Sequence, residues 1–137
     1  MSIKDNKLTA RQWIDEVWNR GSVSLVDEMC SEDYIQYTTQ SAEPSEEDAR
    51  YTKKWITDIR RAFPDFRIAT HEVIAENKKI AIRFSACGTH MKRLLGAHPT
   101  QRKIVWHGAM ILVLKKKRIK RMWILPDHGT FFSQPAR

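Results

Sequence analysis

The sequence predicts an α+β domain in which N-terminal helices pack on the concave face of a curved antiparallel sheet. Two N-terminal segments carry apolar residues at the helical period of three to four. From Asp65 onward the apolar residues alternate with period two, which is typical of strands, and Pro64 stands where the period changes. The chain has 137 residues, a length typical of one domain, so we expect residues 1–137 to form a single unit.

The first half is expected to hold three helices and one short strand. Residues 6–20 carry an apolar stripe and are followed by Gly21, a common helix stop. Ser22 is expected to cap a short second helix, and residues 34–39 to form a strand. A third helix is expected to begin at Ser45, because three acidic residues follow it and suit the positive end of a helix.

The second half is expected to form an antiparallel meander. Hairpin turns are predicted at residues 76–79 and 115–118, where polar residues separate alternating segments. A longer loop, residues 90–102, contains Gly96 and Pro99. Its histidines, His90 and His98, are expected at a pocket mouth or in solvent. The predicted strands cover residues 66–75, 80–87, 104–114 and 119–125.

The formal charge of +8 is unevenly distributed along the chain. Fourteen basic residues but only one carboxylate, Asp127, follow Glu76. The cluster of residues 115–118 with Lys120 and Arg121 raises the alternative of nucleic-acid binding. No aromatic residue interleaves that cluster and it spans a predicted turn, so a solvated hairpin tip is the favoured interpretation.

Several classes of protein are disfavoured by composition. No apolar run approaches the roughly 20 residues of a membrane span, and the N-terminus lacks the apolar core of a secretion signal. Cys30 and Cys87 are too few for a disulfide framework, so we expect reduced thiols in a cytoplasmic protein. The five histidines follow no zinc-binding spacing, so no metal site is expected.

His107 is a candidate functional residue because it interrupts an apolar strand. It shares one strand face with Val105, Ala109 and Ile111. One interpretation is a hydrogen-bonded core histidine. The other is a donor lining a pocket between sheet and helices, able to polarise a substrate carbonyl.

Asp127 is the second candidate. It follows the last predicted strand, four residues after Trp123 and on the same strand parity. It is either a turn or capping residue, or a carboxylate whose pKa an apolar pocket would raise. Adjacent antiparallel strands can bring Asp127 and His107 to one cavity. A carboxylate base beside a neutral donor suits abstraction of a proton next to a carbonyl.

The sequence resembles the SnoaL-like polyketide cyclases, also called predicted ester cyclases, over about residues 8–134. These proteins belong to the nuclear-transport-factor-like superfamily, whose fold is a cone-shaped, cystatin-like α+β barrel. The order and spacing of five stretches carry the resemblance: EVWNRGSVSLVDEMCSEDYIQY, AFPDFRI, IAIRFSACGTHM, LLGAHPTQRKIVWHG and RIKRMWILPDHGTFFSQ.

The resemblance implies an enzyme of the lyase or isomerase type that uses no metal and no organic cofactor. In the family, an Asp at the end of the last strand is acid and base in an intramolecular aldol ring closure, and it matches Asp127. A His on the preceding strand, which helps to hold the substrate, matches His107. The implied partners are a small apolar or polyketide-like substrate and a second copy, packed on the open sheet face.

The sequence departs from the family pattern at three positions. Tyr37 stands where the family often has His, Val105 where cyclases have Gln, and Arg121 where Glu is common. These changes leave the substrate undefined. The residues expected to contact it, with core packing as the alternative for each aromatic one, are Trp18, Tyr34, Tyr37, Trp55, Val105 and Trp123.

Two other functions stay open from the sequence alone. The first is a non-catalytic small-ligand binder on the same scaffold, because fold does not fix function. The second is a related hydratase, isomerase or epoxide hydrolase. An epoxide hydrolase of this fold would need paired carboxylates, and Asp127 has none beside it in the second half of the chain.

Overall fold

The computed structural model describes residues 2–37, 45–94 and 96–125. The predicted catalytic Asp127 lies outside them. The helices are α1 (Ile3–Gln12), a π-helix that follows it directly (Trp13–Asn19), α2 (Ser24–Met29) and α3 (Ala49–Ala62). The strands are β1 (Cys30–Tyr37), β2 (Glu46–Glu47), β3 (Arg67–Glu76), β4 (Lys79–Thr89), β5 (Lys103–Lys115) and β6 (Arg118–Leu125).

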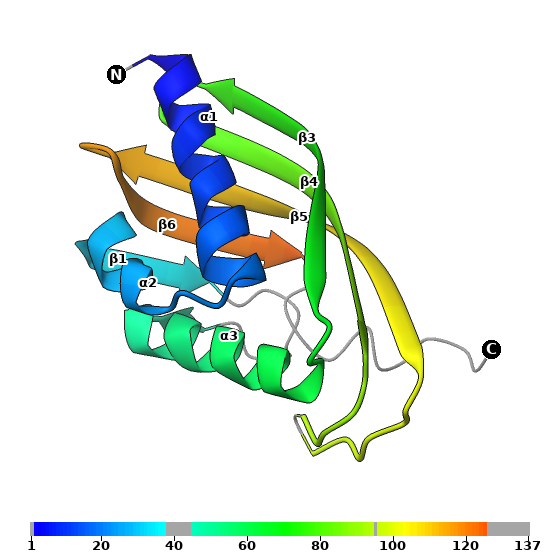
Figure 1. Cartoon of the computed structure of the whole chain (residues 1–137). Helices are drawn as coiled ribbons and strands as arrows, with labels where there is room; N and C mark the ends of the chain where they lie inside the picture. Colours follow the sequence, from blue (N-terminus) through cyan, green and yellow to red (C-terminus); the bar gives the residue numbers. More distant parts are fainter. Residues whose placement is uncertain (1, 38–44, 95, 126–137) are drawn as a thin grey trace.

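The strands form one six-stranded sheet in the order β2-β1-β6-β5-β4-β3. Its long strands bend around the helices, so the predicted α+β plan with helices on the concave face is confirmed (Figure 1). The prediction of a wholly antiparallel sheet is wrong at one pair of strands. β1 runs parallel to β6 and pairs Tyr37 with Trp123. Parallel neighbours need a long crossover, which α3 and the three strands after it supply here.

The first predicted helix is one helical body with two geometries. Ser2 caps it, since its Oγ accepts from the Asp5 N–H at 3.1 Å. From Trp13 the wider π-helical turn takes over, and the Arg20 N–H donates to the Asp15 carbonyl at 3.2 Å. The helix ends before Gly21, whose φ of +74° confirms the predicted stop.

The third helix begins later than expected. Glu46 and Glu47 pair with β1 as the short strand β2 rather than forming a first helical turn. The N-cap is Asp48, whose carboxylate accepts from the N–H groups of Arg50 at 3.0 Å and Tyr51 at 3.2 Å. A carboxylate that satisfies two of the free N–H groups at a helix start caps it better than the Ser45 hydroxyl would.

The core fills the space between the helices and the concave face of the sheet. Its largest side chains have less than 2% of their surface exposed, and they include Trp13, Trp18, Phe63, Phe84 and Met110. None of the helices in the described part of the chain is both long and apolar enough to cross a membrane. The thiols of Cys30, which is buried, and Cys87, which is half-buried, are both free.

Candidate functional site

The six predicted substrate contacts divide between the two faces of the sheet. Trp18, Tyr34 and Trp55 lie in the core, with 1%, 3% and 6% of their surface exposed. Val105 lies on the outer face and is 44% exposed. Tyr37 and Trp123 stack on that outer face, with ring centroids 4.6 Å apart and planes 15° from parallel. The described residues therefore do not bring the predicted set into one pocket.

His107 also lies on the outer face, exposed and in register with Ser85 of β4. The sequence led us to expect His107 in a cavity between the sheet and the helices, and it does not lie there. The reason is the composition of β5, which is apolar on both faces. The bulkier set, with Trp106 and Met110, is the one that packs against the helices, and it leaves the face of His107 and Ala109 outside.

The outer face around His107 carries polar groups on the neighbouring strands. His71, on β3, lies where the β3–β4 register shifts, and its Nε2 forms a hydrogen bond with the Ser85 hydroxyl at 2.8 Å. Ser85 therefore lies between two histidines on three adjacent strands. On the other side of His107, β5 pairs with β6 as far as Ala109 and Leu125.

A buried polar network lies on the inner face, and the sequence pattern did not single out two of its members. The Thr52 hydroxyl donates to Gln36 Oε1 at 2.6 Å and contacts the Tyr34 hydroxyl at 2.9 Å. The Tyr34 hydroxyl also lies 3.8 Å from the sulfur of Met122. A sequence signal existed: Thr52 is the one polar position on the apolar stripe of α3, and Gln36 shares strand parity with Tyr34.

This network is built from groups that stay neutral. Burial raises the pKa of Tyr34 well above its usual range, and Cys30 nearby adds to the shift. Burial also raises the pKa of Cys30 to about 12, with a further contribution from Asp27. A protonated phenol and a protonated thiol can orient a ligand or a neighbouring side chain, but they are poor bases near neutral pH.

Two indole groups of the core keep an unused donor. The Nε1 atoms of Trp13 and Trp18 are buried and have no hydrogen-bond partner among the described residues.

His90 is buried as well and stacks on Phe63 with ring centroids 5.3 Å apart. The expectation that His90 lies at a pocket mouth or in solvent is therefore wrong: bonds from its backbone to Gln101 and Arg102 hold it inside.

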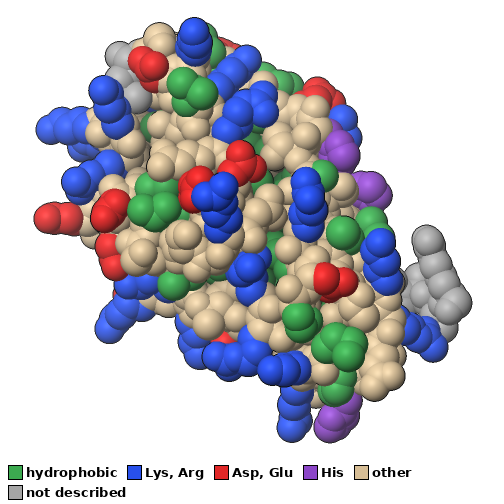
Figure 2. Space-filling model, viewed as in Figure 1, with side chains coloured by type: hydrophobic (Ala, Val, Ile, Leu, Met, Phe, Trp, Pro, Cys, Tyr) green, Lys and Arg blue, Asp and Glu red, His purple; other side chains and the backbone are tan. Residues whose placement is uncertain are grey.

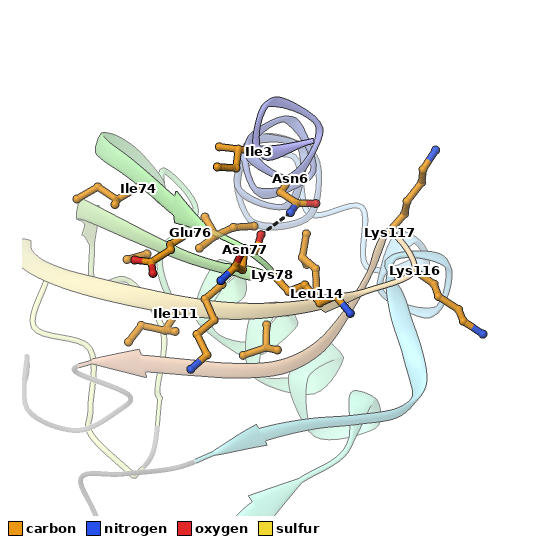
Figure 3. Close-up of a pocket in the computed structure, with 14 residues that line it drawn as sticks. Ile3, Asn6, Ile74, Glu76, Asn77, Lys78, Ile111, Leu114, Lys116 and Lys117 are labelled. Atoms are coloured by element: carbon orange, nitrogen blue, oxygen red, sulfur yellow. Dashed lines mark hydrogen bonds between the residues drawn. The ribbon is translucent and has the colours of Figure 1, made fainter. Parts of the chain in front are cut away.

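The described residues form a hollow of about 1080 Å³ at one end of the sheet (Figure 3). It lies where the start of α1 meets the β3–β4 and β5–β6 turns, and it includes none of the predicted site residues. A second hollow of about 640 Å³ is polar and lies beside Asn19, Arg60 and Asp65. No group of described His, Cys, Asp or Glu residues is arranged to hold a metal ion.

Basic side chains are scattered over the face of the molecule seen in Figure 2, with fewer acidic ones among them. They do not gather there into the single stripe that tracks a phosphate backbone. Lys116 and Lys117 lie at the β5–β6 turn, as predicted, and are exposed. Arg121, from the same basic cluster, donates to the Asp33 carbonyl at 3.0 Å.

Known proteins share this architecture. The model of the SnoaL-like polyketide cyclase family matches residues 8–135. Similar solved structures include AclR of Streptomyces galilaeus, a candidate hydroxylase, at 22% identity, with a TM-score of 0.79 over 90% of each chain. IdmH of Streptomyces antibioticus, a candidate polyketide cyclase, is 19% identical, with a TM-score of 0.77 over 93% of this chain and 96% of its own.

A third structure, a candidate SnoaL-like polyketide cyclase from Jannaschia sp. CCS1, is 15% identical, with a TM-score of 0.81 over 93% of this chain and 89% of its own. At these identities the likeness establishes the shared fold. No curated protein matches the chain.

Proposed function

The chain belongs to the SnoaL-like polyketide cyclase family, and from this membership we propose that it is a cofactor-independent acid–base enzyme. Its reaction is an intramolecular aldol ring closure of a small polyketide-like or ester substrate. The observation that carries the proposal is the match of the family model to residues 8–135, which includes both proposed catalytic residues, Asp127 and His107.

Asp127 is the proposed acid and base. It removes a proton from a carbon flanked by two carbonyls, and the resulting enolate attacks a second carbonyl of the same molecule. Asp127 then returns the proton to the new alkoxide, so atoms and charge balance without an oxidant or a metal. His107 donates a hydrogen bond to the oxygen on which negative charge develops.

The described part of the β5–β6 ladder ends close to His107. The last described pair joins Ala109 to Leu125. His107 stands two residues before Ala109, and Asp127 stands two residues after Leu125. The His107 side chain is exposed, so it is available to a ligand.

The proposed substrate surface is the outer face around His107. Val105 shares that face, and the stacked rings of Tyr37 and Trp123 offer a flat aromatic surface one strand away. Trp18, Tyr34 and Trp55 are buried on the other side of the sheet. We therefore assign these three to the packing that holds the sheet in shape rather than to substrate contact.

We propose a homodimer packed through this same face. Val105, Ile111 and Leu125 are 44%, 40% and 41% exposed there. Exposed apolar residues on one sheet face are typical of an interaction surface. A second copy would also exclude water from the proposed reaction, which strengthens the hydrogen bond from His107.

Proton exchange in heavy water tests the acid–base role without knowledge of the natural substrate. A 1,3-dicarbonyl ester is incubated with the protein, and NMR measures loss of the proton between its carbonyls. Asp127→Asn is expected to lower the protein-catalysed rate by about a hundredfold or more, and His107→Gln by about tenfold. The control is His98→Gln, which changes an exposed loop histidine. Exchange by Asp127→Asn at the wild-type rate would show that Asp127 is not the base.

A second candidate function is a non-catalytic small-ligand binder on the same scaffold. The exposure of His107 favours it, because proton transfer at an open sheet face competes with bulk water. A binder needs no tuned base. Titration of Asp127 by NMR separates the two: an ordinary carboxyl pKa supports the binder, and a raised one supports the enzyme.

A further inference from the structure

We propose that the hollow at the hairpin end of the sheet binds an amphipathic organic anion, a molecule with an apolar body, a carboxylate and a hydroxyl group. We call this hollow the hairpin groove. Its walls come from the start of α1, the β3–β4 turn and the β5–β6 turn, and its volume is about 1080 Å³ (Figure 3). That volume is in the range of small-molecule sites.

Four lysines make the rim of the hairpin groove positive. Lys78 and Lys79 come from the β3–β4 hairpin, and Lys116 and Lys117 come from the β5–β6 turn. None of the four forms an ion pair with a described carboxylate. Glu76 is the one acidic residue in the lining. The excess of uncompensated positive charge favours an anion at this rim.

The β5–β6 turn holds its two lysines in an unfavourable backbone conformation. Lys116 has φ of 52° and Lys117 has φ of 67°, so both are left-handed. A two-residue hairpin of this kind prefers Asn-Gly or Asp-Gly, because a Cβ crowds the backbone at positive φ. The turn sets both lysines at the edge of the hollow, and Figure 3 shows their side chains extending outward from it.

Asn6 supplies a buried acceptor in the wall. Its side chain is 3% exposed, and its Nδ2 donates to the Asn77 carbonyl at 3.0 Å. That bond fixes the orientation of the amide, and Figure 3 shows the oxygen turned away from Asn77. The oxygen, Oδ1, is buried and has no hydrogen-bond partner among the described residues. Buried acceptors are nearly always paired, but this oxygen has almost no accessible surface, so a ligand hydroxyl reaches it only when the Asn6 side chain shifts.

The remaining lining is apolar and gives the groove its preference for an organic molecule over a bare ion. Ile3 and Ile74 are 48% and 60% exposed and lie around the same hollow. A ligand that covers them removes apolar surface from water. The combination of an alkyl body, an acid group and a hydroxyl therefore matches the wall, the rim and the Asn6 oxygen in turn.

This groove is separate from the proposed catalytic residues. Ile111, the nearest lining residue on β5, follows His107 by four positions. At the rise of an extended strand, that separation is about 13 Å. Binding in the hairpin groove can therefore be tested independently of the ring-closing reaction.

Isothermal titration calorimetry on the full chain tests the proposal with three probes of equal chain length: 3-hydroxydecanoate, decanoate and decan-1-ol. We expect 3-hydroxydecanoate to bind about five- to tenfold more tightly than decanoate, because it adds one hydrogen bond to a buried acceptor. Decanol should bind more weakly than decanoate, and added salt should weaken binding of both acids. Equal affinities for decanol and decanoate, or no binding of 3-hydroxydecanoate at millimolar concentration, would overturn the proposal.

A turn variant separates charge from folding. Lys116→Asn with Lys117→Gly removes both charges and introduces the residues that the turn prefers. We expect a higher Tm and about tenfold weaker binding of both acids. The matched control, Lys92→Gln with Arg93→Gln, removes the same charge from an exposed loop near the other end of β4 and should bind like wild type. Unchanged affinity in the turn variant, or an equal loss in the control, would refute the role of the lysines.

Discussion

Thr52 is the link between β1 and α3 in the buried polar network, and replacing it measures what that network contributes to stability. In Thr52→Val the shape is nearly kept, but the hydroxyl is lost. Gln36 Oε1 then loses its donor at 2.6 Å, and the Tyr34 hydroxyl loses its contact at 2.9 Å. Gln36 is 1% exposed and Tyr34 is 3% exposed, so water cannot readily replace Thr52.

The expected loss of unfolding free energy follows from those two contacts. Each neutral hydrogen bond is worth about 1 kcal/mol, and a buried acceptor left unpaired adds about 1 kcal/mol more. Burial of the new methyl group returns about 0.8 kcal/mol. The net destabilisation is then about 2 kcal/mol, which for a chain of this size lowers Tm by roughly 6–10 °C.

Urea unfolding followed by tryptophan fluorescence measures this loss. The matched control is Thr57→Val on the same helix, because Thr57 is exposed and its hydroxyl donates only to the Lys53 carbonyl. That control should change stability by less than about 0.5 kcal/mol. If Thr52→Val is no less stable than Thr57→Val, the network carries no net stability and this reasoning fails.

Two further predictions concern acid sensitivity and assembly. Burial lowers the pKa of His90, so the folded state favours the neutral ring. Its stabilising contribution is complete above the unfolded pKa of about 6.5 and is lost as the pH falls through the lower folded value. His90→Gln should therefore reduce the fall of the urea midpoint as the pH drops below about 6.5, and an unchanged pH dependence would contradict this. Ile111→Glu should convert the proposed dimer to a monomer in sedimentation equilibrium, whereas Leu8→Glu, on an exposed residue of α1, should not. A monomeric wild type would contradict the dimer.

The strands and turns of the second half could be predicted from the sequence because their signals are local. Alternation between apolar and polar residues marks β4, and the polar turn at Asn77 separates it from β3. The parallel pairing of β1 with β6 could not be predicted in this way. It joins residues far apart in the chain, such as Ile35 and Arg121, and neither strand carries a local signal for its neighbour.

The start of α3 shows how nearby capping signals compete. Ser45 and Asp48 are both good N-cap residues, and acidic residues surround both. The pairing of Glu46 and Glu47 with β1 decides between them, and this is a tertiary contact that propensity does not contain. Gln36 and Thr52 were missed for a related reason: each is an ordinary polar residue until the fold places them 2.6 Å apart.

The side of β5 that faces the helices was the hardest feature to predict, and the reason bears on function. When one face of a sheet is covered and the other is solvated, apolar and polar residues alternate along the sequence of each strand. In β5 both parities are apolar: Met110 and Leu112 face the core, while Val105 and Ile111 lie outside. A second copy packed on the outer face, as proposed, would account for apolar residues on both parities. The ambiguity that placed His107 on the wrong side is therefore itself an argument that the outer face has an occupant.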